Sequence, residues 1–160
     1  MIRSEVYKSI RDRLRSQMPI LQYIDLQKGQ MARKDQNYPI PVPACLIEIK
    51  PTRWSSTGGG QLGQTTVSLY LYLDCVTDTF DDAESESSVE ILDSLDSLYE
   101  AVQGLHGEYF NPLSRVADAV VEYRDMTVCF RTDFETVLLQ SIENLVEQTA
   151  PTPTPNFKFR

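Results

Sequence analysis

The feature that most constrains the fold is a strict two-residue alternation between residues 65 and 75. Apolar side chains occupy every second position, and polar or aromatic side chains fill the others: Val67, Leu69, Leu71, Leu73 and Cys75 against Ser68, Tyr70, Tyr72 and Asp74. Successive side chains of a β-strand point to opposite faces, so the segment predicts a strand with one buried face. The two tyrosines predict that another element, or another copy of the chain, covers part of the second face.

Further segments have β character. Residues 43–50 are short, rich in β-favouring residues and bracketed by prolines, which is typical of a strand buried on both faces. Residues 115–123 and 126–138 are predicted to form a hairpin through a tight turn at Arg124 and Asp125. Residues 20–42 read mostly as connecting chain, with a short candidate strand at 23–26. Residues 52–64 hold four glycines and small polar residues, and are predicted to be a flexible loop.

Two segments carry apolar residues at helical spacing. The first stripe recurs every four residues and ends before Pro19: Ile2, Val6, Ile10, Leu14 and Met18. The second is expected to face the core as far as Gly104 or Gly107: Val89, Leu92, Leu95, Leu98, Tyr99, Val102 and Leu105. These elements predict an α+β fold, with a mainly antiparallel sheet of about four strands and two helices packed on one face. Residues 1–140 are predicted to form a single domain, and the Pro/Thr-rich extension 141–160 to be extended or disordered.

The charge is unevenly distributed. The chain has a net charge of −8, which argues against a general nucleic-acid binder. Residues 1–37 hold eight Lys and Arg against four acids, whereas residues 74–100 hold ten acids and no Lys or Arg. One interpretation is two solvated faces. The other is a head-to-tail assembly, in which the basic face of one copy meets the acidic face of the next.

Neither a catalytic group nor a cofactor or metal site is predicted. His106 is the only histidine, and its position at a helix end suits a bond to the last carbonyls of that helix. The three cysteines have no CxxC spacing and are expected to be buried free thiols. The glycines near residue 60 lack the GK[ST] of a phosphate loop, and the acids at 78–96 lack the pattern of a calcium loop. No segment has the ~20 apolar residues of a membrane span, so the protein is predicted to be cytosolic at synthesis.

Other readings stay open at this point. Trp54, in the polar segment, either packs back on its own domain or anchors a partner. A monomeric α+β module that binds a peptide or small ligand is one alternative to an assembly protein. A small enzyme that uses His106 together with the acids at 78–96 is another.

The order of the motifs also carries a resemblance, which spans about residues 3–138. After the N-terminal helix come the strand Pro43-Ala44-Cys45-Leu46-Ile47-Glu48-Ile49, a Gly/Gln loop, the alternating strand 66–74, an acidic helix ending in Leu105-His106-Gly107, and Phe110-Asn111-Pro112-Leu113-Ser114-Arg115. This order resembles the tail terminator and tail completion family of long-tailed bacteriophages, among the head-tail joining and minor tail proteins.

The resemblance implies a structural virion protein without catalytic residues. Such a protein forms a homo-oligomeric ring that caps the tail tube and meets the head connector, while DNA only passes through the lumen. It is made in the host bacterial cytoplasm and resides in the virion tail. The segment 51–64 and the sheet edge are then expected to contact tail-tube subunits, and the acidic segment to face a neighbour or the lumen. The candidate interface residues are Trp54, Gln61, Gln64, Tyr70, Tyr72, Asp81, Asp82, Glu84 and Glu86.

Overall fold

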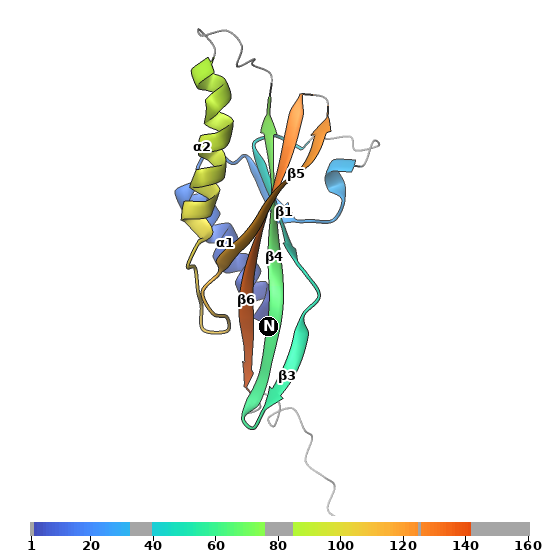
Figure 1. The fold of residues 1–160 in the computed structure, drawn as a ribbon, viewed down its shortest axis with the longest axis vertical. Coiled ribbons are helices and arrows are strands. Elements are labelled where there is room, and N and C mark those ends of the chain that lie inside the picture. The colour runs from blue at the N-terminus through green and yellow to red at the C-terminus, as the bar shows by residue number, and fades with distance from the viewer. Residues whose placement is uncertain (1, 33–39, 76–84, 125, 142–160) are drawn as a thin grey trace, which may run out of the picture.

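The computed structural model describes residues 2–32, 40–75, 85–124 and 126–141. Two helices lie on one side of a twisted sheet (Figure 1). The elements, in chain order, are α1 (Ile2–Gln17), β1 (Tyr23–Leu26), a 3₁₀ turn (Gln30–Ala32), β2 (Ala44–Ile49), β3 (Arg53–Thr57), β4 (Gly60–Asp74), α2 (Ser85–Val102), β5 (Ser114–Arg124) and β6 (Thr127–Ser141). Of the predicted extension 141–160, Ser141 is the last residue of β6, and residues 142–160 lie outside the described residues.

The sheet is larger than predicted. It has six strands rather than about four, in the order β1-β2-β4-β6-β5, with β3 also paired to β4. The β1–β2 pair is parallel, whereas the other pairs are antiparallel. The α+β class and the two helices on one face are as predicted, but the strand number was too low. Strand β3 was not predicted and β1 was predicted only as a short candidate, because short or polar segments lack the apolar period that reveals a strand.

The strand ladder explains which residues form the core. Val67 lies opposite Phe134 in the β4–β6 pair and opposite Ile49 in the β2–β4 pair, so these three side chains share the helix-covered face. The main core on this face joins the sheet to α1 through Val6, Ile10 and Leu14, and to α2 through Leu98, Ala101 and Val102. The predicted stripe of the first helix is confirmed. Burial of these side chains is the main force that holds the helices on the sheet.

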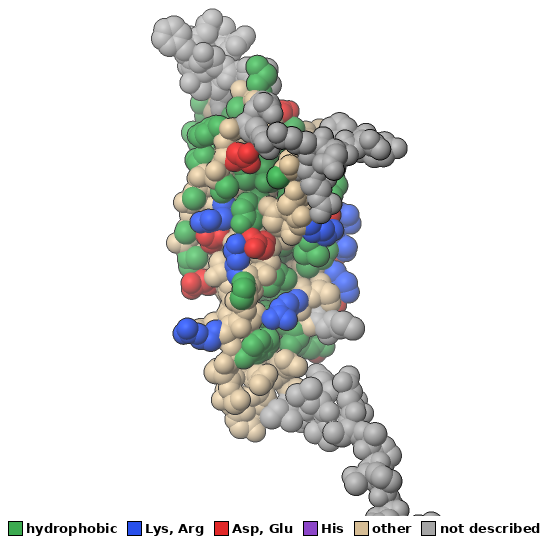
Figure 2. Space-filling model, turned by 90° about the vertical axis from the view of Figure 1, so that its right-hand side faces the viewer, with side chains coloured by type: hydrophobic (Ala, Val, Ile, Leu, Met, Phe, Trp, Pro, Cys, Tyr) green, Lys and Arg blue, Asp and Glu red, His purple; other side chains and the backbone are tan. Residues whose placement is uncertain are grey.

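The other face of the sheet is partly covered by the chain itself. Tyr72 is buried there with Ala44, Leu46 and Cys129, and Met31, Ile40 and Val42 of the 27–43 connection pack against them. The prediction that another element covers the second tyrosine face is therefore confirmed for Tyr72. Farther along this face, charged side chains of both signs lie among hydrophobic ones (Figure 2).

The second helical stripe is only partly buried. Leu98 and Val102 are fully buried, but Val89 and Leu92, nearer the N-terminal end of α2, are 45% and 58% exposed. The prediction that the whole stripe faces the core was wrong for these two residues. The helix ends as predicted at a glycine, because Gly104 has φ +75° and so adopts the left-handed conformation that favours glycine after a helix.

Residues 52–64 form a hairpin, not the predicted flexible loop. Thr57 pairs with Gly60 and Arg53 with Gln64, while Gln64 also pairs with Val137 of β6. Backbone hydrogen bonds to β4 hold a polar strand in place even when its side chains are exposed, which the composition does not reveal. The hairpin that was predicted for residues 115–123 and 126–138 is confirmed. Arg124 pairs with Thr127, and Met126 in the turn has φ +66°.

Candidate functional site

The most distinctive surface is a polar ribbon, formed by β3, the first residues of β4 and the last residues of β6. It extends as the lower end of the molecule in Figure 1. Most of its outward side chains are uncharged and exposed, among them Ser55, Ser56 and Gln61. In Figure 2 this lower end is largely free of charged and hydrophobic side chains. The ribbon therefore offers backbone and amide groups, rather than apolar area, to a partner.

Trp54 lies at the base of the ribbon, where the ribbon joins the core. It lies opposite Gly63 in the β3–β4 pair, and a Cβ atom added at Gly63 would come within 2.8 Å of the Trp54 ring. The ring packs against the main core as a half-buried residue. Beside it, Ile2, Arg3 and Leu138 help to line a shallow pocket of about 390 Å³. The interpretation that Trp54 packs on its own domain is thus confirmed, and one side of its ring borders an open pocket.

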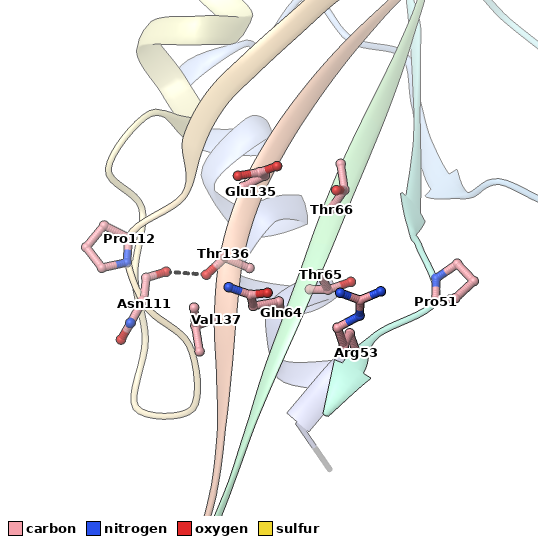
Figure 3. Close-up of a pocket in the computed structure, with 10 residues that line it drawn as sticks. All are labelled: Pro51, Arg53, Gln64, Thr65, Thr66, Asn111, Pro112, Glu135, Thr136 and Val137. Carbon is pink, nitrogen blue, oxygen red and sulfur yellow. Dashed lines mark hydrogen bonds between the residues drawn. The ribbon is translucent and has the colours of Figure 1, made fainter. Parts of the chain in front are cut away.

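A second shallow pocket, of about 540 Å³, lies across the sheet where the ribbon meets the core. Its floor is formed by β4 and β6, and Figure 3 shows Pro51 and Arg53 on one side and Asn111 and Pro112 on the other. The hydroxyl of Thr136 donates a 2.7 Å hydrogen bond to the carbonyl oxygen of Asn111, which attaches that wall to β6. The floor is polar and open, and lacks the apolar enclosure of a typical small-molecule site.

A network of charged groups lies on the helix-free face beyond this pocket. Glu48 accepts hydrogen bonds from Lys50 Nζ at 2.5 Å and from the Tyr70 hydroxyl at 2.8 Å. Burial alone raises the pKa of the Glu48 carboxyl, but these two donors outweigh it, and the pKa is lowered. The pKa of Lys50 is raised, first by its hydrogen bond to Glu48. The network is held as an ion pair, and none of its groups is tuned for proton transfer at neutral pH.

A neighbouring pair extends the network. Ser68, which is fully buried, donates a 2.6 Å hydrogen bond to Asp133. Arg131 Nε lies 3.2 Å from the other carboxylate oxygen of Asp133, an ion pair by distance that lacks hydrogen-bond geometry. Sequence reasoning missed the network, since the hydrogen bonds from Ser68 and Tyr70 come from a different strand. The signal in the sequence was that Glu48 and Lys50, like Arg131 and Asp133, are two residues apart in a strand and so share a face.

The structure distributes the predicted interface residues over separate surfaces. Gln61 is exposed on the ribbon and Gln64 lines the larger pocket. Tyr70 belongs to the charged network, and Tyr72 is buried, with its pKa raised first by desolvation. Of the acids, Asp81, Asp82 and Glu84 lie outside the described residues. Glu86 falls within α2, but its side chain is not described.

Of the residues considered for chemistry, His106 and the three cysteines are described, whereas the acids at 78–84 lie outside the described residues. His106 is exposed, and its Nδ1 lies 3.3 Å from the carbonyl oxygen of Gly104, as predicted for a histidine at a helix end. All three cysteines are free; Cys45 and Cys129 are buried and Cys75 partly so. Burial raises the pKa of Cys45 to about 12, so this thiol is a poor nucleophile. Within the described ranges, no group of three His, Cys, Asp or Glu side chains gathers to hold a metal ion.

The likeness of this chain to known proteins lies in the fold, not in the sequence. No family model and no curated protein matches the sequence. Among solved structures, a chain of the "Virion of native gene transfer agent (GTA) particle" is similar, with a TM-score of 0.49 and 10% sequence identity. The alignment covers 84% of this chain and 94% of that one. No helix within the described residues is long and apolar enough to span a membrane.

Proposed function

We propose that this chain is a structural protein of a phage or phage-like virion and acts as a tail terminator. Copies of the chain form a homo-oligomeric ring that caps the tail tube, stops its polymerisation and joins the tube to the head connector. Acidic side chains that face the lumen let DNA pass without binding, by like-charge repulsion. The protein belongs in the virion tail, and in the host bacterial cytoplasm while virions assemble.

The observation that carries the proposal is the polar ribbon that extends β3, β4 and β6 beyond the helix-covered core. A ribbon with little apolar area gains little from burial on its own. Among the strands that the structure describes, its outer strand β3 pairs with β4 alone, so the other edge of β3 offers backbone groups to a further strand. A tail-tube subunit that adds a strand here uses main-chain hydrogen bonds for affinity. The same segment holds Trp54, Gln61 and Gln64, which the family resemblance implies are contact residues.

Two apolar side chains of the ribbon make it selective for a partner with a matching apolar contact. Leu62 lies opposite Leu139 on the helix-free face of the sheet, and Leu62 is 37% exposed. A small apolar spot within a polar surface is where a partner gains most from excluding water. We therefore assign Leu62 to the tube contact.

The test uses polymerisation of the tail-tube protein encoded in the same genome, followed by electron microscopy. The wild-type chain is expected to shorten the tubes and to appear as a ring at one end. Leu62→Asp is expected to lose this effect by at least ~10-fold in the concentration required, since a buried carboxylate costs more than ~1.4 kcal/mol. The control is Val116→Asp, at an exposed apolar residue of β5 away from the ribbon. Tubes of unchanged length in the presence of wild-type protein would contradict the proposal.

A further inference from the structure

One corner of the helix-covered face has no cover from the described part of the chain. A single side of α2 carries Val89, Leu92, Asp96, Tyr99 and Gln103 at spacings of three and four residues. At the C-terminal end of α2, β5 contacts this side of the helix. The guanidinium of Arg115 lies 3.9 Å from the centre of the Tyr99 ring, and its backbone N–H donates a 2.9 Å hydrogen bond to the Gln103 side chain.

From that contact, β5 runs diagonally away from α2 (Figure 1). Val120 and Tyr123 lie opposite Phe130 and Val128, so they share the helix-covered face of the sheet. Because the helix has diverged from the strand, Tyr123 is 72% exposed and Val120 is 47% exposed. These two side chains of β5 and the exposed Val89 and Leu92 of α2 flank the same end of the helix-covered face, and the four are here called the α2/β5 corner.

Carboxylates surround the α2/β5 corner. Glu90, Asp93, Asp96 and Glu100 are exposed on α2, which has no Lys or Arg. No ion pair between these four acids and another described residue occurs. Asp118 of β5, on the same face, has only a long ion pair of 3.5 Å with Arg115. The corner therefore favours a partner that combines apolar side chains with positive charge, and disfavours contact with another acidic corner.

The opposite edge of the sheet, at β1, combines apolar side chains with positively charged ones. Helix α1 packs mainly against α2, and its smaller contacts reach β6 and also β1 and β2, at the far end of the sheet from β5. Tyr7, Arg11 and Arg15 follow at four-residue spacing and so share one side of α1, where Arg11 lies over the Tyr7 ring and pairs with Asp12. Two apolar side chains are exposed beside these cations: Ile20 at 52% and Leu26 at 38%. These residues define the α1/β1 edge.

We infer that the α2/β5 corner of one copy receives the α1/β1 edge of a second copy. The occupant is another copy of this chain, because the described surface has exposed apolar residues beside Arg15 and the Asp12-paired Arg11 at one edge, and exposed apolar residues beside carboxylates at the other. The two surfaces are different and lie at opposite ends of the sheet, so the contact is head-to-tail and propagates to a ring or a filament. The inference rests on the proposed ring, and names the interface that builds it.

Charge reversal tests the pairing. Arg11→Glu/Arg15→Glu damages only the α1/β1 edge, and Asp93→Arg/Asp96→Arg damages only the α2/β5 corner. Each variant alone is expected to lose self-association by at least ~10-fold in light scattering or sedimentation. A mixture of the two is expected to regain it, since each then meets a partner of opposite sign at both contacts. Glu135→Arg, on the helix-free face of the sheet, is the matched control and is expected to associate like the wild type.

Leu92→Asp provides a second probe that does not depend on paired charges, and circular dichroism checks that each variant is folded. Wild-type protein that stays monomeric at its highest soluble concentration would overturn the inference. So would a mixture that fails to reassociate when both variants are folded. If the oligomer forms and responds as expected but does not shorten tail tubes, the interface stands and the terminator role fails.

Discussion

Ser68 and Asp133, which are 65 positions apart in the sequence, are joined by a 2.6 Å hydrogen bond between neighbouring strands of the sheet. The serine is fully buried, and the Asp133 side chain is 15% exposed. A hydrogen bond to a carboxylate in such a place contributes more than one at the surface, because the group has little water to replace its partner. This bond connects the buried middle of β4 to the charged network on the helix-free face.

Ser68→Ala is therefore expected to destabilise the protein by about 1.5–3 kcal/mol in urea unfolding. Ser55→Ala is the control, because Ser55 is exposed and its hydroxyl lies 3.4 Å from its acceptor. The control is expected to change stability by less than about 0.5 kcal/mol. Equal effects of the two substitutions would mean that the Ser68 bond contributes nothing beyond a surface contact.

Glu48 gives the fold a dependence on acid pH. The pKa of its carboxyl is lowered from the ordinary value of 4.5, so its contribution to stability is fully present above that value. The contribution is lost as the pH falls through the lowered pKa. The stability difference between wild type and Glu48→Gln is thus expected to shrink as the pH is reduced from about 6 to about 3. Thermal unfolding across this range measures it.

Tyr70→Phe offers a second measurement of the same network. It removes one of the two donors to Glu48 while leaving the carboxyl in place. The pKa of Glu48 is then expected to rise toward its ordinary value, so the pH-dependent contribution to stability becomes smaller and its loss is complete at a higher pH than in the wild type. A difference between wild type and Glu48→Gln that does not vary with pH would refute this account.

Two leucines on α2 test which part of the helix is packed. Leu98 is fully buried, whereas Leu92 is exposed at the α2/β5 corner. Leu98→Ala is expected to cost about 2–5 kcal/mol, because it removes packing and leaves a cavity. Leu92→Ala is expected to cost less than about 0.5 kcal/mol in the monomer. Chemical denaturation at low protein concentration compares them, and a large loss for Leu92→Ala would show that the corner is packed in the monomer.

At Gly63, at the base of the ribbon, any larger residue is predicted to destabilise the protein. An added Cβ would lie 2.6 Å from Thr52 Cγ2 and 2.8 Å from the Trp54 ring, so Gly63→Ala is expected to displace the indole and cost about 1–3 kcal/mol. Trp54 is the only tryptophan, and its fluorescence reports the displacement directly. Gly58→Ala is the control, since an added Cβ there has no described atom within 4 Å. An unchanged emission spectrum in Gly63→Ala would contradict the close contact.

The elements with apolar periodicity followed from the residues, and those without it did not. The alternation around Leu69 and the four-residue stripe around Ile10 each predicted the type of element and the buried side, since burial imposes the pattern. Strand β3 was read as a loop because its residues are polar and its pairing depends on β4 and β6. The stripe of α2 did not show that Val89 and Leu92 are exposed, because this depends on where β5 diverges from the helix.

Fewer of the contacts that build the candidate surfaces could be predicted from the sequence. The hydrogen bonds from Lys50 and Tyr70 to Glu48 need the register of β2 against β4, in which Glu48 lies opposite Ser68 and next to the Tyr70 position. A single sequence does not specify that register before the strands are paired. The charge asymmetry between the first 37 residues and residues 74–100 was visible, but not which cations share an edge with Ile20 and Leu26. That information comes from the packing of α1 beside β1.

The ladder between β4 and β6 runs without a break from Gly60 and Ser141 at one end to Asp74 and Thr127 at the other. Fifteen residues at about 3.4 Å each make a two-stranded beam about 50 Å long. The length of this beam is fixed by the number of residues in each strand, and does not depend on how side chains pack. Inserting two residues in each strand at matching positions preserves the inward and outward faces and lengthens the beam by about 7 Å. The spacing between whatever docks at its two ends can thus change in discrete steps, while the core keeps its composition.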